Sequence, residues 1–466
     1  MATSASFDDA LALSRFGLGS GPEGCDAIGG RARQILADEI RAGGARLMTE
    51  APLPDTPELL MHQKAYYAEA KAREKATPSL NAVDIAQAPL IVPANQVYMQ
   101  ELAVRFNSAY LAPDIGFNER LVMFWANHFA VSTDKSSNIG LTAGAFEREA
   151  IRPNIFGRFK DLLLSVETHP CMLIYLDNQD SIGPDSAGGR KSRKGLNENL
   201  AREIMELHIL GVGGGYTQAD VTSFAAALTG WTYTITPDER PNDPMPLRDG
   251  FKFASGNHQP GSREVLGRTY KNDGFFQATD IMLDLAERPA CARFIALKLA
   301  QHFVSDTPPQ SLVDRLADVF QRTDGDLALV SHALIESQEV WSPNCEKIRL
   351  PQEYLIAMMR ATGVTFLAPQ IDGILGSMGE RMWRPGGPNG YSDRFDTWAT
   401  PTGLYARMEA ANRIGRAVKE NIDPREFAQS LLGPRLSETT LAAISQAENA
   451  RQGLSLTFMS PEFIRR

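Results

Sequence analysis

Cysteines are few in this chain of 466 residues: there are four, and no two of them form a CxxC pair. This spacing excludes a zinc knuckle, and the cysteine usage does not point to an oxidising compartment. No apolar run approaches the roughly 18 residues of a membrane-spanning helix, so none is predicted. Residues 1–9 lack the basic and apolar regions of a signal peptide. We therefore expect a cytoplasmic protein, with co-export to the periplasm alongside a partner as the alternative.

Positive charge is also in short supply, with 47 Lys and Arg against 56 Asp and Glu and a net charge of −9. A uniformly basic nucleic-acid-binding protein is therefore excluded, and we expect no nucleic-acid partner. The sequence contains no GxSxG elbow and no glycine-rich loop ending in GK[ST], so covalent serine hydrolases and P-loop proteins gain no support. With 43% hydrophobic and 22% charged residues, the composition is that of an ordinary globular protein.

Most of the chain has helical periodicity, and no alternation of strands and helices indicates a Rossmann or TIM fold. The stretch Trp231–Gly274 differs, because it alternates Thr and Tyr and is then rich in Pro, Asp and Gly. This pattern predicts two to four short strands. Residues 371–390 are rich in Gly and Pro and are predicted to form a loop. We predict a mainly α fold, with one large helical domain over residues 1–466 and a small β-hairpin excursion at 231–274.

The best-defined candidate site lies on a helix predicted over Asn197–Leu210. Asn199, Glu203 and Glu206 are spaced i, i+4 and i+7, so on an α-helix they form one polar stripe. If the stripe is partly buried, the two carboxylates raise each other's pKa or hold a divalent cation. The alternative is a solvated stripe in which Arg202 pairs with Glu206. On a straight helix His208 points away from both carboxylates, and the spacing matches neither HExxH nor ExxH.

Two further features stand near this helix in the sequence. Asn127 and His128 are adjacent polar residues on an aromatic segment, and His128 is a candidate ligand or acid–base group if it faces the glutamates; the alternative is a core histidine. The loop Ser186–Gly195 carries four cations between Arg190 and Lys194, immediately before the candidate helix. It is either a solvated loop or an anion clamp that is mobile until an anion binds. Thr217 and Asp220 fit a helix-capping pattern, so the glycines before them are structural punctuation.

Several runs together resemble the bacterial family catalogued as domain of unknown function 1800. The runs are Arg15-Phe-Gly17, Phe124-Trp-Ala-Asn-His-Phe-Ala130, Tyr175-Leu-Asp-Asn178, Gly195-Leu-Asn-Glu-Asn-Leu-Ala-Arg-Glu-Ile-Met-Glu-Leu-His208, Leu228-Thr-Gly-Trp231 and Ser460-Pro-Glu-Phe463. The resemblance covers nearly the whole chain and implies a helical protein, often exported and often encoded beside a sulfatase-like protein. This chain departs from the family in lacking an export signal and in reading His258-Gln-Pro-Gly-Ser-Arg263 where His-Asp-x-Gly-x-Lys is expected.

Two functions are compatible with these observations. The first is an enzyme acting on an anionic or polyhydroxylated substrate, such as a phosphorylated, sulfated or glycan compound. Its catalytic residues would be His128, Glu203 and Glu206, with a divalent cation as a candidate cofactor. The second is a non-catalytic binding partner of the sulfatase-like protein that the resemblance implies. The residues expected to bind substrate in the enzyme are Asn127, Arg190, Lys194, Asn199 and His258.

Overall fold

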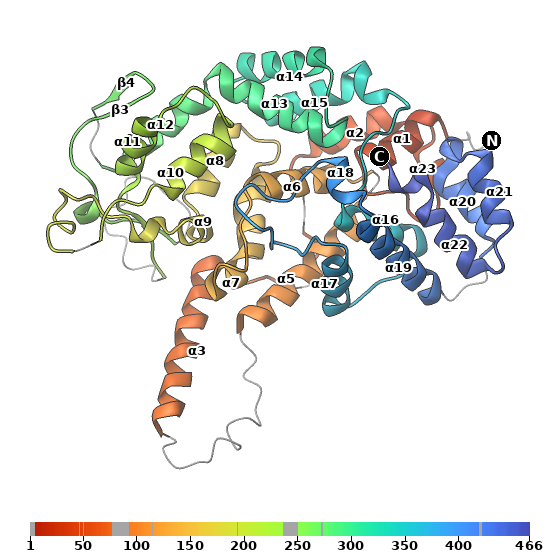
Figure 1. Ribbon diagram of the computed structural model, residues 1–466, viewed down its shortest axis with the longest axis horizontal. Helices are drawn as coiled ribbons and strands as arrows, with labels where there is room; N and C mark the ends of the chain where they lie inside the picture. The colour runs from red at the N-terminus through yellow and green to blue at the C-terminus, as the bar shows by residue number, and fades with distance from the viewer. Residues whose placement is uncertain are drawn as a thin grey trace.

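The computed structural model describes residues 5–45, 47–49, 51–76, 93–113, 115–192, 194–235, 250–271, 274–418 and 422–466. The fold is mainly α-helical, as the sequence predicts (Figure 1). Strands in these ranges form two small antiparallel sheets of two strands each. None of the helices described is long and apolar enough to cross a membrane.

Helices follow one another through both halves of the chain. In the first half they are α1 (Phe7–Arg15), α2 (Ala32–Ala42), α3 (Thr56–Ala76), α5 (Pro93–Tyr110), α6 (Phe117–His128), α7 (Ser137–Phe146), α8 (Phe159–Glu167), α9 (Pro170–Tyr175), α10 (Asn199–Glu203) and α11 (Gln218–Leu228). In the second half they are α12 (Phe275–Ala286), α13 (Pro289–Phe303), α14 (Gln310–Arg322), α15 (Leu327–Glu336), α16 (Pro351–Thr362), α17 (Ala368–Ser377), α18 (Phe395–Trp398), α19 (Pro401–Ala417), α20 (Pro424–Leu432), α21 (Glu438–Ser445), α22 (Ala450–Met459) and α23 (Pro461–Ile464).

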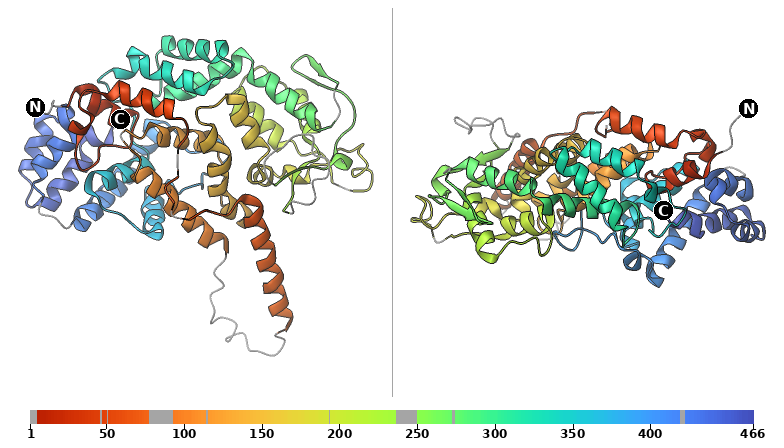
Figure 2. Two further views of the ribbon diagram at one scale, coloured as in Figure 1. Left: turned by 180° about the vertical axis from the view of Figure 1, so that it is seen from behind. Right: turned by 90° about the horizontal axis from the view of Figure 1, so that it is seen from above.

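The helices form an elongated body in which α5, α6 and α7 occupy the middle (Figures 1 and 2). One end of the body contains α8 to α12 and the short strands, and the other end contains α16 and α19 to α23 (Figure 1). The helices α13, α14 and α15 run along one side, and α3 extends away from the body (Figures 1 and 2). Apolar side chains from Ala10 to Ile464 form the main core, so both ends share one buried cluster with the middle.

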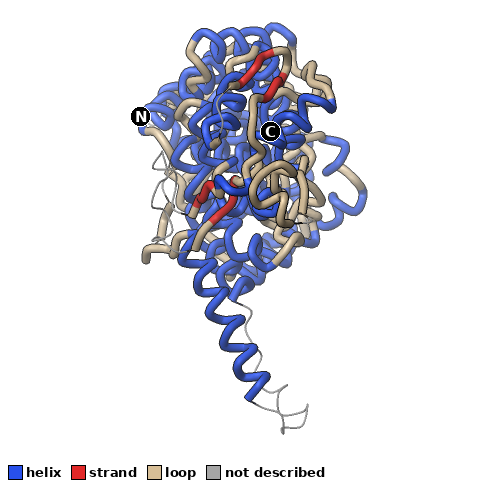
Figure 3. Tube along the Cα trace, turned by 90° about the vertical axis from the view of Figure 1, so that its left-hand side faces the viewer, coloured by secondary structure: helices blue, strands red, loops and turns tan. Residues whose placement is uncertain are grey.

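The β excursion has the strands that the sequence predicts. Strand β1 (Trp231–Tyr233) pairs with β2 (Phe251–Phe253), and β3 (Arg263–Val265) pairs with β4 (Arg268–Tyr270). In Figure 3 these strands are small additions to a body of helices. The predicted excursion also includes residues 236–249, 272 and 273, which lie outside the described residues.

The predicted loop at 371–390 is wrong in its first part, because α17 occupies Ala368–Ser377. Pro369 stands in the first turn of α17, where a missing N–H costs nothing. Ile371, Ile374 and Leu375 are buried on one face of this helix. That apolar face outweighs the low helix propensity of Gly373 and Gly376. The prediction followed the glycines and overlooked the spacing of the apolar residues.

Helix α6 has a fixed start, which matters because it carries Asn127 and His128. The buried carboxylate of Glu39 accepts hydrogen bonds from the backbone N–H groups of Ile115, Gly116 and Phe117, at 3.0, 2.9 and 2.6 Å. These bonds satisfy N–H groups at the start of α6, and the negative charge suits the positive end of the helix dipole. Gly116, with φ of 84°, turns the chain into the helix.

Buried charges connect α6, in the middle of the body, to the end that contains α16. The carboxylate of Glu353 on α16 pairs with Arg120 of α6 at 3.0 Å and with Arg466 at 2.8 Å. His302 at the end of α13 contacts the carboxylate of Asp393 at 2.8 Å, and burial lowers the pKa of His302 to about 4. Because an unpaired buried charge is costly, these pairs hold the elements in one arrangement.

Candidate functional site

The predicted helix over Asn197–Leu210 is not a straight α-helix. The α-helical turn α10 ends at Glu203, and Ile204–Ile209 form the π-helical segment η5. In a π-helix the backbone hydrogen bond joins residues five apart, so His208 lies close to one turn beyond Glu203. The prediction that His208 points away from the glutamates holds for a straight α-helix, and this segment is not one. The helix ends at Gly211, whose φ of 79° is left-handed, and α11 begins with the predicted capping box of Thr217 and Asp220.

Glu203 and Glu206 are both partly exposed, but their surroundings differ. Burial raises the pKa of Glu203, the nearby charge of His208 lowers it, and the like charge of Glu206 raises it. The side chain of Tyr216 lies close to Glu206, and burial and the negative charge of this carboxylate raise the pKa of Tyr216. Burial, followed by the charge of Glu203, raises the pKa of Tyr175 to about 12. The two glutamates are therefore half-buried, and Tyr175 and Tyr216 lie within range of their charges.

Behind this pair lies a buried histidine–carboxylate pair. His208 Nδ1 is 2.7 Å from Glu167 Oε1, and neither residue is accessible to solvent. Because the carboxylate accepts, the proton of this hydrogen bond lies on Nδ1 of His208, and the second ring nitrogen is Nε2. That Nε2 atom and Glu167 Oε2 are buried and have no hydrogen-bond partner in the described part of the chain. Sequence reasoning missed Glu167 and Tyr216, because they come from separate elements.

His128 packs against His208 and does not contact either glutamate by a hydrogen bond or ion pair in the described residues. Its Nε2 donates to the backbone carbonyl of His208 at 3.0 Å, and the two rings are 6.2 Å apart. Burial lowers the pKa of His128 well below its usual value, and the charges of Lys298 and His208 lower it further. The ring is therefore neutral at neutral pH, with a buried Nδ1 that has no partner among the described residues.

The expected pairing of Arg202 with Glu206 is replaced by another. Arg202 lies 3.0 Å from Glu198 Oε2 and also contacts Gln218. Its guanidinium is therefore directed towards the start of α10 and away from Glu206. Asn199 is exposed at the start of the same helix.

The basic loop 186–195 is folded against the segment before His258. The N–H of Gly188 donates to Gly256 O at 2.7 Å, and the N–H of Arg190 donates to Ser186 O at 3.1 Å. Lys194 pairs with Asp180, and the side chain of Arg190 is exposed. Arg193, the third of the four cations, lies outside the described residues.

The remaining predicted residues, Asn127 and His258, have backbone partners. Asn127 Nδ2 donates to Tyr391 O at 2.8 Å, and the N–H of Tyr391 donates to Asn127 Oδ1 at 2.7 Å. His258 Nδ1 donates to Thr229 O at 3.0 Å, and its Nε2 accepts from the N–H of Gly274 at 3.1 Å. The side chain of Asn127 fastens a loop, and that of His258 joins both ends of the β excursion. Over the residues that the structure describes, no three His, Cys, Asp or Glu side chains gather as metal ligands.

The structure thus defines a mainly helical protein with a half-buried glutamate pair over a buried histidine–carboxylate pair. The family model for the protein of unknown function DUF1800 matches residues 11–465, nearly the whole chain. The chain belongs to this family, as the sequence motifs indicate. Neither a curated protein nor a solved structure matches the chain.

Proposed function

We propose that the protein is an enzyme that hydrolyses a small anionic or polyhydroxylated substrate, with Glu203 and Glu206 as its acid–base pair. The observation that carries the proposal is the different environment of the two carboxyl groups. Burial and a like charge raise the pKa of Glu203, whereas Glu206 lies close to the side chain of Tyr216. Two carboxyl groups in different environments are a common arrangement for general acid–base catalysis.

In this mechanism Glu203 is the proton donor. Its raised pKa retains the proton to higher pH than an ordinary glutamate, and the proton passes to the oxygen of the leaving group. Glu206 is the base: it takes a proton from the attacking water, so the two carboxyl groups exchange protonation states over one turnover. Tyr216 lies close to Glu206 and is the group placed to orient that carboxylate.

The buried histidines act as positioning residues. Glu167 fixes the ring of His208 through Nδ1, and His128 holds the backbone carbonyl of His208. These contacts fix the π-helical segment on which Glu206 and His208 both lie. Chemistry of this kind depends on placement to within about 0.5 Å, which buried hydrogen bonds provide.

The groups expected to bind an anion are Arg190 and Lys194, with Asn199 orienting the substrate. Arg190 is exposed and precedes α10 in the chain, which allows its guanidinium to pair with a phosphate or sulfate. Lys194 would exchange Asp180 for the substrate, and an exposed ion pair of this type is weak enough to allow it.

The direct experiment compares hydrolysis of 4-nitrophenyl phosphate, sulfate and glycosides by wild type, Glu203→Gln and Glu206→Gln. We expect each variant to lose about 10²–10⁴-fold in rate on the substrate that wild type hydrolyses. The matched control is Glu198→Gln, a glutamate at the start of the same helix that pairs with Arg202 and should keep its activity.

A second readout does not depend on knowing the substrate. Because the charge of Glu206 raises the pKa of Glu203, Glu206→Gln should lower that pKa, which a carboxyl-carbon NMR titration measures. Folding stability should be unchanged or higher. If the pKa of Glu203 does not move and Glu203→Gln hydrolyses every substrate as fast as Glu198→Gln, the acid–base pair is wrong. Binding to a sulfatase-like protein would then be the function to test.

Proteolysis tests the anion loop separately. Sulfate or a sulfated glycan should slow subtilisin cleavage within residues 186–195, and Arg190→Gln should abolish that protection. Lys191→Gln, in the same exposed loop, is the control for a general loss of charge. Cleavage that is the same with and without every anion would remove Arg190 and Lys194 from the binding site.

A further inference from the structure

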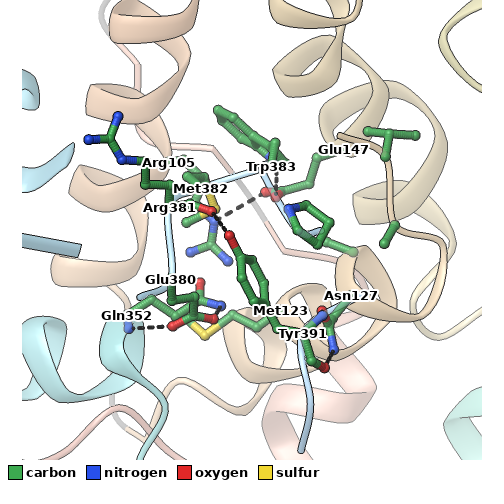
Figure 4. A pocket seen from close by; sticks show the side chains of 14 residues that line it. Arg105, Met123, Asn127, Glu147, Gln352, Glu380, Arg381, Met382, Trp383 and Tyr391 are labelled. Atoms are coloured by element: carbon green, nitrogen blue, oxygen red, sulfur yellow. Dashed lines mark hydrogen bonds and ion pairs between the residues drawn. The ribbon is translucent and has the colours of Figure 1, made fainter. Parts of the chain in front are cut away.

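The hollow beside α6 in Figure 4 is too small for an organic ligand. It has room for about 40 Å³, enough for a few water molecules, and Arg105 in its wall pairs with Glu147 at 3.5 Å. A roomier groove of about 560 Å³ lies at the base of α3, between this helix and strand β1. This volume is typical of small-molecule sites. The groove is lined by Leu60, Gln63, Lys64 and Tyr67 of α3, Asn138 of α7, Gln179, and Thr232, Tyr233, Thr234 and Ile235 in and after β1.

One face of α3 forms the first wall of the groove. The four lining residues of this helix are spaced i, i+3, i+4 and i+7, so they lie along one stripe. Leu60 is buried at the inner end of the stripe, and Tyr67 is half exposed at the outer end. Gln63 Nε2 donates to Ser137 Oγ at 3.0 Å, and the Tyr67 hydroxyl lies 3.2 Å from the same oxygen. Contacts with α7 therefore fix the polar side chains of this wall before any ligand binds.

The opposite wall comes from β1 and the short helix η4 (Asn178–Asp180). Asn178 is buried, and its Nδ2 donates to Trp231 O at 3.0 Å, which fastens η4 to the start of β1. Gln179 Nε2 donates to Asp180 Oδ2 at 3.4 Å, whereas Gln179 Oε1 is buried and has no hydrogen-bond partner in the described part of the chain. A buried amide oxygen without a donor costs free energy, which a hydroxyl group of a ligand would recover.

The groove offers hydrogen bonds and ring faces more than charge. Three of its side chains are amides, and an amide both donates and accepts, as the hydroxyl groups of a sugar do. Tyr67 and Tyr233 add aromatic rings, which can cover the apolar C–H face of a sugar ring. Among the described residues that line the groove, Lys64 is the only one with a charged side chain. Phosphate and sulfate are usually bound by bidentate arginines, so this lining favours an uncharged ligand with many hydroxyl groups.

We propose that this groove binds an uncharged sugar unit of a polysaccharide, with the ring of Tyr67 against one face of the sugar and the amides of Gln63 and Gln179 on its hydroxyl groups. The groove is open to solvent beside a helix that extends away from the body (Figure 1). A unit within a long polysaccharide suits such a groove, because both ends of the polymer can leave it. None of the lining residues belongs to the glutamate pair, and the binding does not depend on the proposed function.

The experiment is electrophoresis of the full chain in native gels that contain hydroxyethyl cellulose, laminarin, dextran or mannan, with dextran sulfate as the anionic comparison. We expect at least one neutral polysaccharide to retard wild type, and Tyr67→Ala to weaken that affinity by at least about tenfold. The matched control is Tyr405→Ala, an exposed tyrosine on α19, which should migrate as wild type does. Equal migration of wild type and Tyr67→Ala in every gel would overturn the proposal. Retardation by dextran sulfate alone would overturn the assigned ligand class.

Two further variants separate the groove from folding and from the glutamate pair. Gln179→Ala keeps the test decisive if Tyr67→Ala does not fold: it should melt as wild type does and bind the polysaccharide more weakly, and unchanged binding would refute the groove. Glu203→Gln removes the proposed proton donor and should be retarded as wild type is. Loss of retardation in Glu203→Gln would place the polysaccharide at the glutamate pair and refute the groove. A failed hydrolysis assay with binding still lost in Tyr67→Ala would overturn the proposed function alone.

Discussion

Replacing Glu380 by Gln should change how folding stability depends on pH. Glu380 is fully buried, and its pKa in the folded protein is about 8 against 4.5 for an ordinary glutamate. In the folded protein the neutral acid has a suitable neighbour, because Gln352 Oε1 is buried and has no hydrogen-bond partner within the described residues. Glutamine resembles this neutral acid in shape and can donate to the same oxygen, so the variant should fold.

The sign follows from which state binds more protons. Between about pH 4.5 and pH 8 the folded protein keeps the proton on Glu380 while the unfolded chain releases it, so stability falls as pH rises. Each pH unit in this range corresponds to about 1.4 kcal/mol, and the loss from about pH 5.5 to about pH 7.5 is roughly 2.5 kcal/mol, because Glu380 is partly ionised at the upper pH. Above the folded-state pKa the contribution becomes constant. Glu380→Gln lacks this contribution at every pH.

Urea unfolding of wild type and Glu380→Gln at the two pH values measures the effect, because other titrating groups cancel in the difference. The stability of the variant relative to wild type should rise by roughly 2.5 kcal/mol between the lower and the higher pH. Glu336→Gln, an exposed glutamate on α15, should show no such change. A stability difference that stays constant over this range would show that Glu380 is ionised in the folded protein, and the reasoning would fail.

Two further substitutions test the packing of residues against α6. Gly390→Ala should destabilise the fold by about 2 kcal/mol or more, since the φ of Gly390 is +72° and a Cβ atom would lie 2.4 Å from Asn127 O. The control is Gly386→Ala, which has open space around it and should change thermal stability little. Arg152→Met should cost about 3–5 kcal/mol in urea unfolding because it leaves buried carboxylates unpaired, whereas the exposed Arg394→Met should unfold as wild type does. Equal effects within either pair would contradict the corresponding argument.

Features governed by local sequence could be predicted well. The mainly α class, the short strands between Trp231 and Gly274, and the capping box of Thr217 and Asp220 all depend on neighbouring residues. The error at α17 came from the same kind of reasoning, because glycine propensity was given more weight than the buried face of Ile371 and Ile374. Helix propensity is a weak guide where tertiary packing stabilises the helix.

The candidate site could be predicted only in part. The stripe of Glu203 and Glu206 was visible from spacing, but the π-helical segment was not, since a segment of 6 residues is too short for its shift of the apolar pattern to be recognised. That segment brings His208 towards Glu203, and Glu167 joins from α8, 41 residues earlier in the chain. Contacts between distant elements are set by packing, and single-sequence periodicity carries no information about them.

Two residues at the end of α6 are adjacent in sequence but have different partners in the fold. Successive residues on an α-helix point about 100° apart, and here Asn127 and His128 contact different parts of the fold. The side chain of Asn127 bonds to the backbone of Tyr391, and the ring of His128 bonds to the backbone carbonyl of His208. Glu206 lies on the π-helical segment η5, and a second π-helical segment, η2 (Glu147–Ile151), carries Glu147. A π-helical turn costs helix stability, and such turns occur often at functional sites.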